Sequence, residues 1–336
     1  MKPTSDSAWD AYVRAHPDGT FFHLAAWRSV IEQAFKHRTY QMEVHRDGAL
    51  VGVAPLVELR SRLFGHALIS NGFCVGGSPI ASDADAKAHL LDRVEHLGRE
   101  LGVDYIELRD APIGGPGWSA QDGVYATFDG PIAVEAESNL KQIPKRQRAV
   151  VRKALERDLQ VKIETSLEAF YPLFSRTMRD HGTPAMPRRL FEQMLKIFGP
   201  DCEILTVYEG SRPIASVFSY FYGDRVMPYW TGSHPDARAL GANDLMCWSL
   251  MRRGVERGCT VFDFGRSKVD TGPYNLKRHW GFEPRPITNQ YCLIGIDALP
   301  NINPTNPRYA AMIGVWRHLP LPVANTLSPL LSRSLG

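Results

Sequence analysis

The sequence predicts an α/β protein built from two similar units, each a mixed central sheet flanked by helices. Its 336 residues are enough for roughly two domains. Residues 97–110 superpose without a gap on residues 253–266, which places Gly102 on Gly258 and Glu107 on Asp263. In both segments the end of a helix is followed by a glycine stop and then by a strand. Two such elements in the same order indicate an internal duplication of one α/β unit.

In the first half, amphipathic spacing and turn residues predict a layer of helices and strands. Asp47-Gly48 is typical of a two-residue hairpin turn between two strands, the second of which is interrupted by Pro55. Gly72 to Pro79 is glycine-rich, but it lacks the Lys-Ser/Thr of a phosphate-binding loop, so an ordinary turn is expected. The predicted helices are Asp6–Ala15, Leu24–Phe35 and Asp83–Leu101, and the predicted strands are Tyr40–His45, Leu50–Leu59 and Tyr105–Arg109.

The second half repeats this pattern after a basic connecting segment, Asn139 to Arg157. Three strands that follow one another closely predict a meander, and a helix that ends at Gly258 precedes the last strand. The predicted helices are Leu167–His181, Arg188–Phe198 and Leu245–Arg257, and the predicted strands are Glu203–Tyr208, Pro213–Tyr222, Arg225–Thr231 and Val261–Gly265.

Composition and charge argue against several classes of protein. A net charge of +3 is too small to indicate nucleic-acid binding by itself, and we expect no DNA partner. The five cysteines are scattered without a CxxC pair, and the histidines form no HxxH or HExxH pair, so we expect no disulfide framework and no metal. The N-terminus has no apolar core of a signal peptide, and no window approaches the roughly 20 apolar residues of a spanning helix. We therefore expect a cytoplasmic protein.

The stretch from Thr260 to Pro284 is the strongest candidate for a functional site. A β-favouring strand is followed by a dense polar set, and open α/β sheets build sites just past the carboxyl ends of such strands. The alternative is a strand that runs into a solvated loop. The polar side chains that we consider here are Asp263, Arg266, Lys268, Tyr274 and Lys277.

Two further groups of residues are candidates for substrate binding. The connecting helix carries Lys145, Arg146 and Arg148, which could form an anion-binding wall, although composition alone favours a solvated basic helix. Its residues Ala149, Val150 and Leu155 are expected to face the protein. In the meander, Tyr229 and Trp230 could line a substrate groove or could belong to the core of the sheet.

These motifs resemble a known family. The meander, glycine-containing turn, helix and strand follow the order of the GNAT acyltransferase fold. Residues 238–243, RALGAN, resemble the pyrophosphate loop of that fold, with Asn243 in place of the last small residue. The doubled unit, the IPKRQR entry, FDFGRS and YNLKRHWGF resemble the FemAB-type branch, which comprises two GNAT-like domains and includes peptidoglycan-bridge peptidyltransferases. The likeness covers roughly residues 20 to 295 and is closest to FemAB-like proteins of exosortase and exopolysaccharide systems.

The resemblance implies roles for individual residues. Lys277 matches a family lysine thought to stabilise charge at the reacting carbonyl, and the basic stretch would place the phosphates of an acceptor. The donor loop would comprise Arg238, Gly241, Ala242 and Asn243. The donor would be acyl-CoA or another acyl carrier, such as acyl carrier protein or aminoacyl-tRNA. Because the long helical arm of many transfer-RNA-using members is missing, the sequence favours an acyl thioester over tRNA.

Acyl transfer to an amine needs alignment, removal of a proton and stabilisation of an oxyanion. No G-x-S-x-G elbow is present, so direct attack by the amine is favoured over a covalent intermediate. Asp263 is the candidate base or acceptor orienter, with an ion pair to Arg266 as the alternative. Arg266 and Lys268 could hold phosphate or carboxylate, and Tyr274 could act as an acid or hydrogen-bond donor.

We therefore expect an N-acyltransferase that acts on an amine of a cell-envelope or exopolysaccharide precursor. The expected organisation is an acceptor-holding unit over residues 1–138, a basic linker helix over 139–160, a catalytic, donor-binding unit over 161–300 and a proline-rich tail over 301–336. The tail could dock on the body or contact the inner face of the membrane through a short amphipathic helix. Two alternatives remain open: an aminoacyl-tRNA-dependent peptidoglycan-bridge transferase, and a non-catalytic GNAT-like module that binds a glycan or a protein partner.

Overall fold

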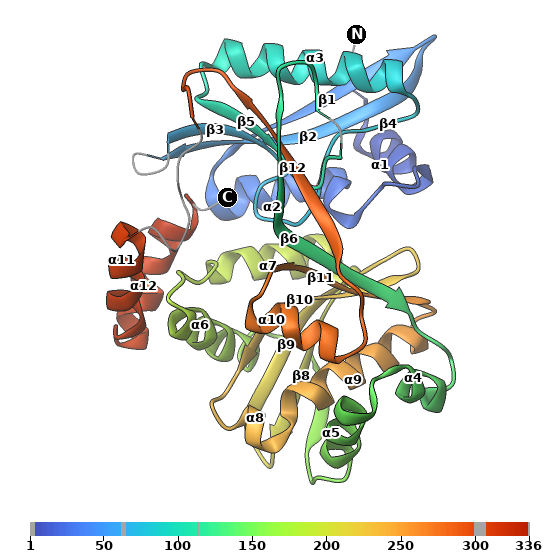
Figure 1. The fold of residues 1–336 in the computed structure, drawn as a ribbon, viewed down its shortest axis with the longest axis vertical. Coiled ribbons are helices and arrows are strands. Elements are labelled where there is room, and N and C mark those ends of the chain that lie inside the picture. The colour runs from blue at the N-terminus through green and yellow to red at the C-terminus, as the bar shows by residue number, and fades with distance from the viewer. Residues whose placement is uncertain (1–3, 62–64, 113, 299–306, 335–336) are drawn as a thin grey trace. The chain divides into compact units, whose positions relative to one another are not determined.

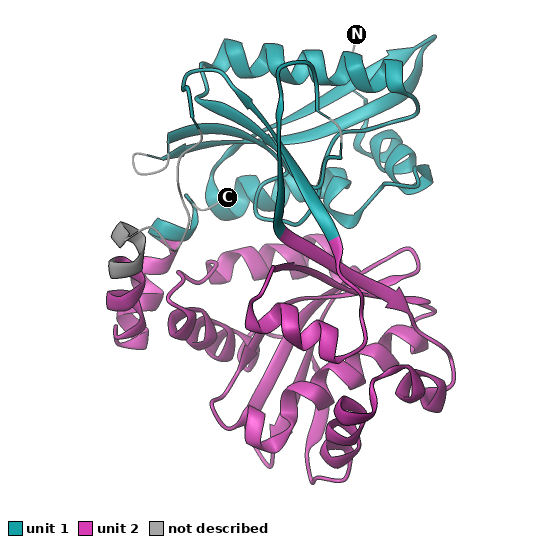
Figure 2. Ribbon diagram, viewed as in Figure 1, with its two compact units in different colours: residues 1–124, 286–306, 330–336 teal, residues 125–285, 307–329 magenta. Residues whose placement is uncertain are grey.

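The computed structural model describes residues 4–61, 65–112, 114–298 and 307–334 (Figure 1). The side chains of residues 307–311 lie outside this description, as does the first part of the predicted tail, residues 301–306. The chain divides into two compact units (Figure 2). Unit 1 comprises residues 1–124, 286–306 and 330–336, and unit 2 comprises residues 125–285 and 307–329. Residues 125–138, which the sequence places with the first unit, thus belong to unit 2.

Unit 1 is a mixed sheet with helices on both faces. Its strand order is β1-β2-β3-β5-β12 followed by the first half of β6, and β3 and β5 are parallel. Helix α3 covers one face, where Leu90 and Val94 pack on Leu56 and Leu68, and α1 and α2 lie on the other face (Figure 1). The elements are α1 (Asp6–Ala15), a 3-10 turn (Phe21–His23), α2 (Ala25–Phe35), β1 (Arg38–Arg46), β2 (Ala49–Ser61), β3 (Gly65–Ser70), β4 (Ile80–Ala81), α3 (Ala84–Leu101), β5 (Tyr105–Leu108), β6 (Ser119–Pro131) and β12 (Arg285–Leu293).

Unit 2 repeats this plan. From β7 to β11 its strands follow one another in space as in sequence, the second half of β6 completes the sheet beside β11, and β10 and β11 are parallel. The elements are α4 (Ala136–Gln142), α5 (Lys145–Leu155), β7 (Gln160–Glu164), α6 (Phe170–His181), α7 (Arg188–Phe198), a 3-10 turn (Gly199–Asp201), β8 (Cys202–Glu209), β9 (Arg212–Tyr222), β10 (Arg225–Ser233), α8 (Ala237–Leu240), α9 (Ala242–Glu256), β11 (Val261–Lys268), α10 (Gly272–His279), α11 (Pro307–Arg317) and α12 (Leu321–Ser332).

The predicted class is confirmed: the chain is an α/β protein whose two units repeat one plan. In each unit a helix connects two parallel neighbouring strands, and a left-handed glycine ends the helical segment, Gly102 at φ 62° and Gly258 at φ 82°. Only glycine adopts this conformation without steric cost, which explains the matching positions. The hairpin at Asp47-Gly48 also forms, with both residues at positive φ. Strand β2 is continuous through Pro55, which stands opposite Gln41 of β1.

Each unit is completed by a strand from a distant part of the sequence. The antiparallel partner of β5 is β12, with Ile106 opposite Cys292. The antiparallel partner of β11 is β6, with Arg266 opposite Thr127. β6 is the next strand after β5 of unit 1 in the sequence, but it completes unit 2. β12 is the next strand after β11 of unit 2, but it completes unit 1. The repeats are consequently not two consecutive segments of chain.

Unit 2 has a core on each face of its sheet. On one face, α5 and α9 pack on β8 and β9 through a cluster that includes Val151, Leu245, Val207 and Trp280. On the other face, aromatic rings gather beneath α6 and α7, and the ring centroids of Phe170 and Phe191 lie 5.0 Å apart. Among the described helices, none combines the length and apolar character needed to cross a bilayer.

Candidate functional site

The parallel strands β10 and β11 pair at only two positions and then separate. Arg225 stands opposite Val261, and Val226 stands opposite Phe262. β10 continues to Ser233 and β11 to Lys268, without a further pair between them in the described part of the chain. The facing edges therefore present backbone N–H and C=O groups that the neighbouring strand does not satisfy. An opening at the carboxyl ends of parallel strands is where sheets of this class bind ligands.

The predicted donor loop lies at the start of α9, which follows β10. Gly241 has φ +70° and forms the N-cap of α9. A Cβ at Gly241 would lie 3.0 Å from the Cβ of Ala154, so α5 packs directly against this turn. Ala242 is buried and Arg238 is exposed. The structure thus brings the four predicted residues together, including Asn243, at a helix N-terminus, whose N–H groups favour an anion.

Helix α5 presents a different face to the protein from the one predicted. Val151 and Ala154 are buried, whereas Val150 and Leu155 are 40% and 46% exposed and Ala149 is exposed. The prediction that Ala149, Val150 and Leu155 face the protein is therefore wrong. The physical reason is that α5 packs on α9 and the donor loop, and that contact admits the small side chain of Ala154.

The basic residues of α5 fall into two groups. Lys145 and Arg146 are exposed in the first turn of the helix. Arg148 instead donates from Nε to the carbonyl of Ile143 at 3.2 Å and from Nη2 to the carbonyl of Lys141 at 3.2 Å. Its guanidinium therefore holds the connection between α4 and α5, while Lys145 and Arg146 extend toward solvent.

Helix α5 is also tied to the first turn of α9 by side chains. Gln147 donates from its amide nitrogen to Oδ1 of Asp244. Burial raises the pKa of the Asp244 carboxyl, and the bond from Gln147 acts in the opposite direction. No sequence pattern signals this contact, because the two residues are 97 positions apart.

Lys277 is the most unusual charged group of the predicted site. Helix α10 places its side chain, only 8% exposed, beside β11, where Nζ donates to the carbonyls of Gly265 at 2.8 Å and Arg266 at 3.1 Å. The rings of Phe128 and Phe264 lie 5.4 and 5.9 Å from Nζ. Burial lowers the pKa of Lys277 to about 7. The two bonds use two of the three N–H groups of an ammonium, and the third can donate to a developing oxyanion.

Asp263 lies on β11 at a bulge in the pairing with β6. Its Oδ1 accepts from the N–H of Gly265 at 2.8 Å, and its Oδ2 lies 3.8 Å from Nη1 of Arg225. Arg225 also contacts Asp129 at 2.9 Å. Burial raises the pKa of the Asp263 carboxyl, and Arg225 acts in the opposite direction. The arginine beside Asp263 is therefore Arg225 rather than Arg266, the partner that the sequence alternative proposed.

The remaining predicted residues of the polar stretch surround this strand. The guanidinium of Arg266 lies 4.5 Å from the ring centroid of Tyr125 on β6. Tyr274 on α10 packs edge-on against Phe128, with the ring centroids 5.2 Å apart. Lys268 is half-buried at the end of β11. The turn of α10 thus brings Tyr274 and Lys277 to one side of β11.

Tyr229 and Trp230 are half-buried members of the aromatic cluster. Their ring centroids lie 4.6 Å apart, and Trp230 is 5.0 Å from Phe191 of α7. Tyr220 lies 5.0 Å from Tyr229. Both residues therefore contribute to the packing of β10 against the helices, which corresponds to the alternative interpretation from sequence. Their role in binding substrate stays a prediction.

Sequence reasoning missed Arg225 and Asp129, the pair that faces Asp263. Arg225 begins β10, and Asp129 lies on β6, which the sequence analysis did not recognise as a strand. The only local signal is the alternation of apolar residues around Phe128. Register across a sheet depends on pairing between distant segments, so single-sequence periodicity could not place Asp129 beside Asp263.

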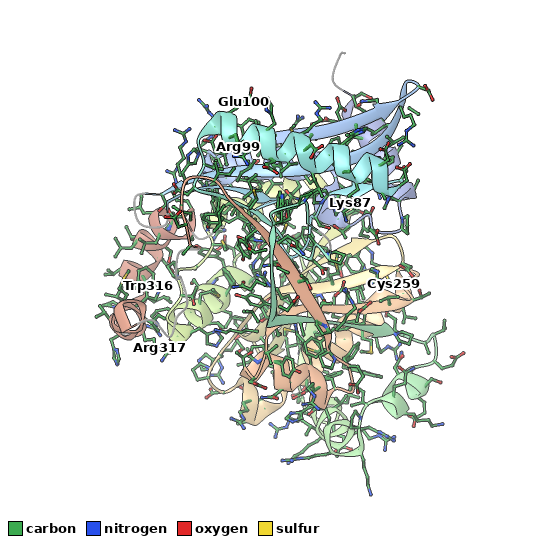
Figure 3. The ribbon with its side chains drawn as sticks, turned by 45° about the horizontal axis from the view of Figure 1, so that its top comes forward. Lys87, Arg99, Glu100, Cys259, Trp316 and Arg317 are labelled. Atoms are coloured by element: carbon green, nitrogen blue, oxygen red, sulfur yellow. The ribbon has the colours of Figure 1, made fainter. Side chains whose placement is uncertain are left out.

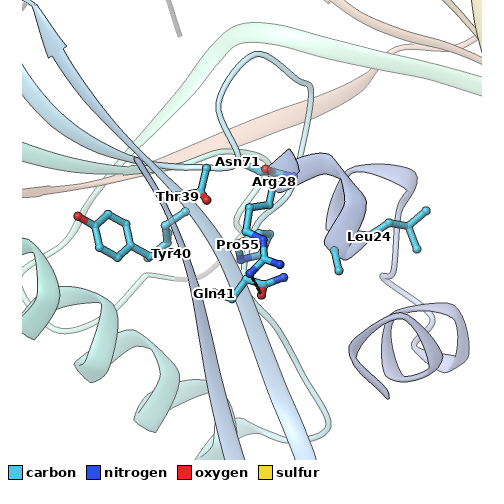
Figure 4. A pocket seen from close by; sticks show the side chains of 9 residues that line it. Leu24, Arg28, Thr39, Tyr40, Gln41, Pro55 and Asn71 are labelled. Atoms are coloured by element: carbon cyan, nitrogen blue, oxygen red, sulfur yellow. Dashed lines mark hydrogen bonds between the residues drawn. The ribbon is translucent and has the colours of Figure 1, made fainter. Parts of the chain in front are cut away.

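Two surface pockets lie in unit 1. One is lined by Leu24, Tyr40 and Asn71, and there Arg28 Nη1 donates to Gln41 Oε1 at 2.7 Å (Figure 4). The other lies along α3 and β1 beside His96 and Met42. None of the predicted site residues lines either pocket. In the described part of the chain, no group of three His, Cys, Asp or Glu side chains could hold a metal ion.

Comparisons with known proteins agree with this geometry. The family model described as "Acetyltransferase (GNAT) domain" matches residues 141–278. No curated protein sequence matches the chain.

Solved structures share the fold at low sequence identity. FemX is 17% identical over 87% of this chain and 97% of that chain, with a TM-score of 0.69. L-PGS from Bacillus licheniformis is 12% identical over 94% and 96% of the two chains, with a TM-score of 0.56. A tandem GNAT protein from the clavulanic acid biosynthesis pathway is 11% identical over 87% and 94%, with a TM-score of 0.52. Residues 141–278 are therefore similar to the GNAT acetyltransferase domain, and the chain shares the fold of FemX.

Proposed function

We propose that the protein is an N-acyltransferase that transfers an acyl or aminoacyl group to an amine of a cell-envelope or exopolysaccharide precursor. The observation that carries this proposal is the separation of β10 and β11 after two residue pairs, with a helix N-terminus after one strand and Lys277 beside the other. An extended molecule with amide groups can hydrogen-bond to such unpaired strand edges as an added strand would.

An acyl thioester of coenzyme A fits these features. The amide groups of its arm would hydrogen-bond to the unpaired edges of β10 and β11. Its diphosphate would accept hydrogen bonds from the N–H groups at the N-terminus of α9, close in sequence to Arg238 and Asn243. The shared fold with FemX supports a second candidate, an aminoacyl-tRNA-dependent peptidoglycan-bridge transferase, because the likeness covers 97% of FemX. Acyl carrier protein would present the same arm as coenzyme A.

The chemistry is a direct attack of the acceptor amine on the donor carbonyl. The new carbon–nitrogen bond forms as the carbonyl oxygen gains negative charge, and the carbon–sulfur bond then breaks. Lys277, as the ammonium, would donate its third N–H to that oxygen. Asp263 would take the proton that the amine loses, and its raised pKa suits this role. Tyr274 would give a proton to the departing thiolate.

The acceptor would be held by basic side chains. Lys145 and Arg146 extend from α5 into solvent and suit the phosphates of an activated or lipid-linked precursor. Arg266 and Lys268 would bind phosphate or carboxylate groups at the end of β11. Arg148 would affect the binding of these phosphates indirectly, because its hydrogen bond to the carbonyl of Ile143 holds α5 in position.

A thermal-shift titration with coenzyme A, acetyl-CoA and longer acyl-CoAs tests the donor. We expect saturable stabilisation, because a ligand that binds only the folded state raises its stability. Arg238→Gln should reduce the shift, whereas Arg252→Gln, at an exposed arginine of α9, serves as the matched control. The absence of any shift with thioesters would refute a thioester donor. Failure to bind charged tRNA as well would favour the non-catalytic binding module.

A further inference from the structure

Helix α12 presents apolar side chains on two different faces. Ala324 and Ser328 are buried, whereas Val323, Leu327 and Leu330 are 42%, 39% and 67% exposed. With 3.6 residues per turn, the three exposed side chains fall within an arc of roughly 60°. The helix therefore buries one stripe against the protein and leaves a second, apolar stripe uncovered.

The buried stripe fixes residues 307–329 of the two C-terminal helices on unit 2. Ser328 accepts from the N–H of Ala185 at 3.1 Å, and the carbonyl of Leu319 accepts from Arg179 of α6 at 3.3 Å. On α11, Ile313 packs so closely on Gly182 that a Cβ there would lie 2.4 Å from it. Trp316 of the same helix is buried (Figure 3). The outer stripe is consequently presented by docked helices.

Helix α11 also exposes apolar side chains, and positive charge lies at the end of each of the two helices. Met312 and Val315 are 52% and 67% exposed. Arg317 at the end of α11 is exposed (Figure 3). His318, which follows it, and Arg333, after α12, are also exposed. No aspartate or glutamate follows Asp297 in the sequence, although the whole chain has 36 acidic and 39 basic residues. The two helices are therefore apolar and cationic in sequence, and the acid beside them, Asp180 of α6, is paired with Arg179 at 2.6 Å.

We propose that the outer faces of α11 and α12 form a docking surface for an anionic lipid bilayer. Exposed apolar side chains of this kind enter the boundary between headgroups and acyl chains, and nearby arginines are attracted to anionic headgroups. A negatively charged bilayer matches both the apolar stripe and the positive charge at the ends of the two helices. The binding is weak and reversible, because only five apolar side chains take part. It does not depend on the proposed transferase activity.

Co-sedimentation of the full chain with vesicles tests this surface. We expect the wild type to bind vesicles of equal phosphatidylglycerol and phosphatidylcholine, and to bind pure phosphatidylcholine vesicles much less. Salt should weaken the binding. Val315→Glu with Leu330→Glu, at the two most exposed positions, should lower the partition coefficient roughly tenfold or more. Val134→Glu, at a residue 81% exposed and outside the tail, should leave the binding unchanged.

Four outcomes would overturn the proposal. The wild type could fail to bind anionic vesicles or could bind neutral vesicles equally. The double variant could retain full binding to anionic vesicles while Val161→Glu loses it. That result would place the lipid-binding surface at the exposed strand β7. Light scattering could show a wild-type dimer that the double variant abolishes, which would make this face an interface between copies. A melting temperature equal to that of the wild type confirms that the double variant folds.

Discussion

Replacing Lys277 by methionine should change how the stability of the protein depends on pH. The side chain is 8% exposed and carries a charge that burial disfavours, so its pKa falls from 10.5 to about 7. Methionine has a similar length and no charge, so Lys277→Met removes the titration while filling most of the same space.

The sign and size of the effect follow from proton linkage. Below about pH 7 both folded and unfolded chains carry the proton, and the cost of burying the ammonium is fully present. Between about pH 7 and 10.5 the unfolded chain holds a proton that the folded chain has released, so stability rises with pH. A pKa of about 7 in the folded state makes the wild type gain roughly 2 kcal/mol between pH 7 and pH 9 from this group alone.

Urea unfolding of wild type and Lys277→Met at pH 7 and pH 9 measures this gain. The free energy of unfolding of the wild type, relative to the variant, should increase by about 2 kcal/mol between the two pH values. Other groups titrate in both proteins and cancel in the difference. Lys153→Met, at an exposed position of α5, controls for the loss of one lysine. If the free energy of unfolding changed equally with pH in the wild type and in Lys277→Met, the inference that Lys277 is buried and loses its proton near pH 7 would be refuted.

Four further predictions concern the residues of the proposed site. Lys277→Met should lower kcat by roughly a hundredfold, and wild-type kcat should fall as pH rises above about 7, because the ammonium that stabilises the oxyanion is lost; a pH–rate profile measures this. Gly241→Val should abolish the thermal shift by coenzyme A and cost about 1–3 kcal/mol of stability, because φ +70° is strained for valine. Lys145→Gln with Arg146→Gln should weaken binding of a phosphate-bearing acceptor in calorimetry without changing Tm. Arg148→Gln should lower Tm, because it removes donors to the carbonyls that end α4.

Much of the architecture could be predicted because it depends on local patterns. The helix that stops at Gly102 and the helix that stops at Gly258 each precede a strand that runs parallel to its neighbour. Left-handed glycines, hairpin turns and helical periodicity act within a few residues, so a single sequence reveals them. The same locality explains why the predicted donor loop around Gly241 coincides with the N-terminus of a helix.

The candidate site could be predicted in part. Lys277, Tyr274 and Asp263 were singled out because polar residues crowd behind a buried strand, and the structure places all three on or beside β11. The partner of Asp263 could not be predicted, because Arg225 reaches it only through the pairing of β10 with β11. The face of α5 was wrong, because apolar residues occur on more than one side of that helix and only packing selects Val151 and Ala154.

By itself the sequence determined the α/β class, the duplication and the stretch that bears the polar groups, because these follow from composition, spacing and turn chemistry along the chain. The tertiary structure alone decided the partners of β6 and β12. In the sequence β6 follows β5 of unit 1, but it pairs with β11 of unit 2, and β12 follows β11 but pairs with β5. The tertiary structure alone also decided that β10 and β11 separate after Val226 and Phe262, and that Lys277 is buried against two carbonyls. These features depend on contacts between residues far apart in the sequence, whose free energy no local pattern records.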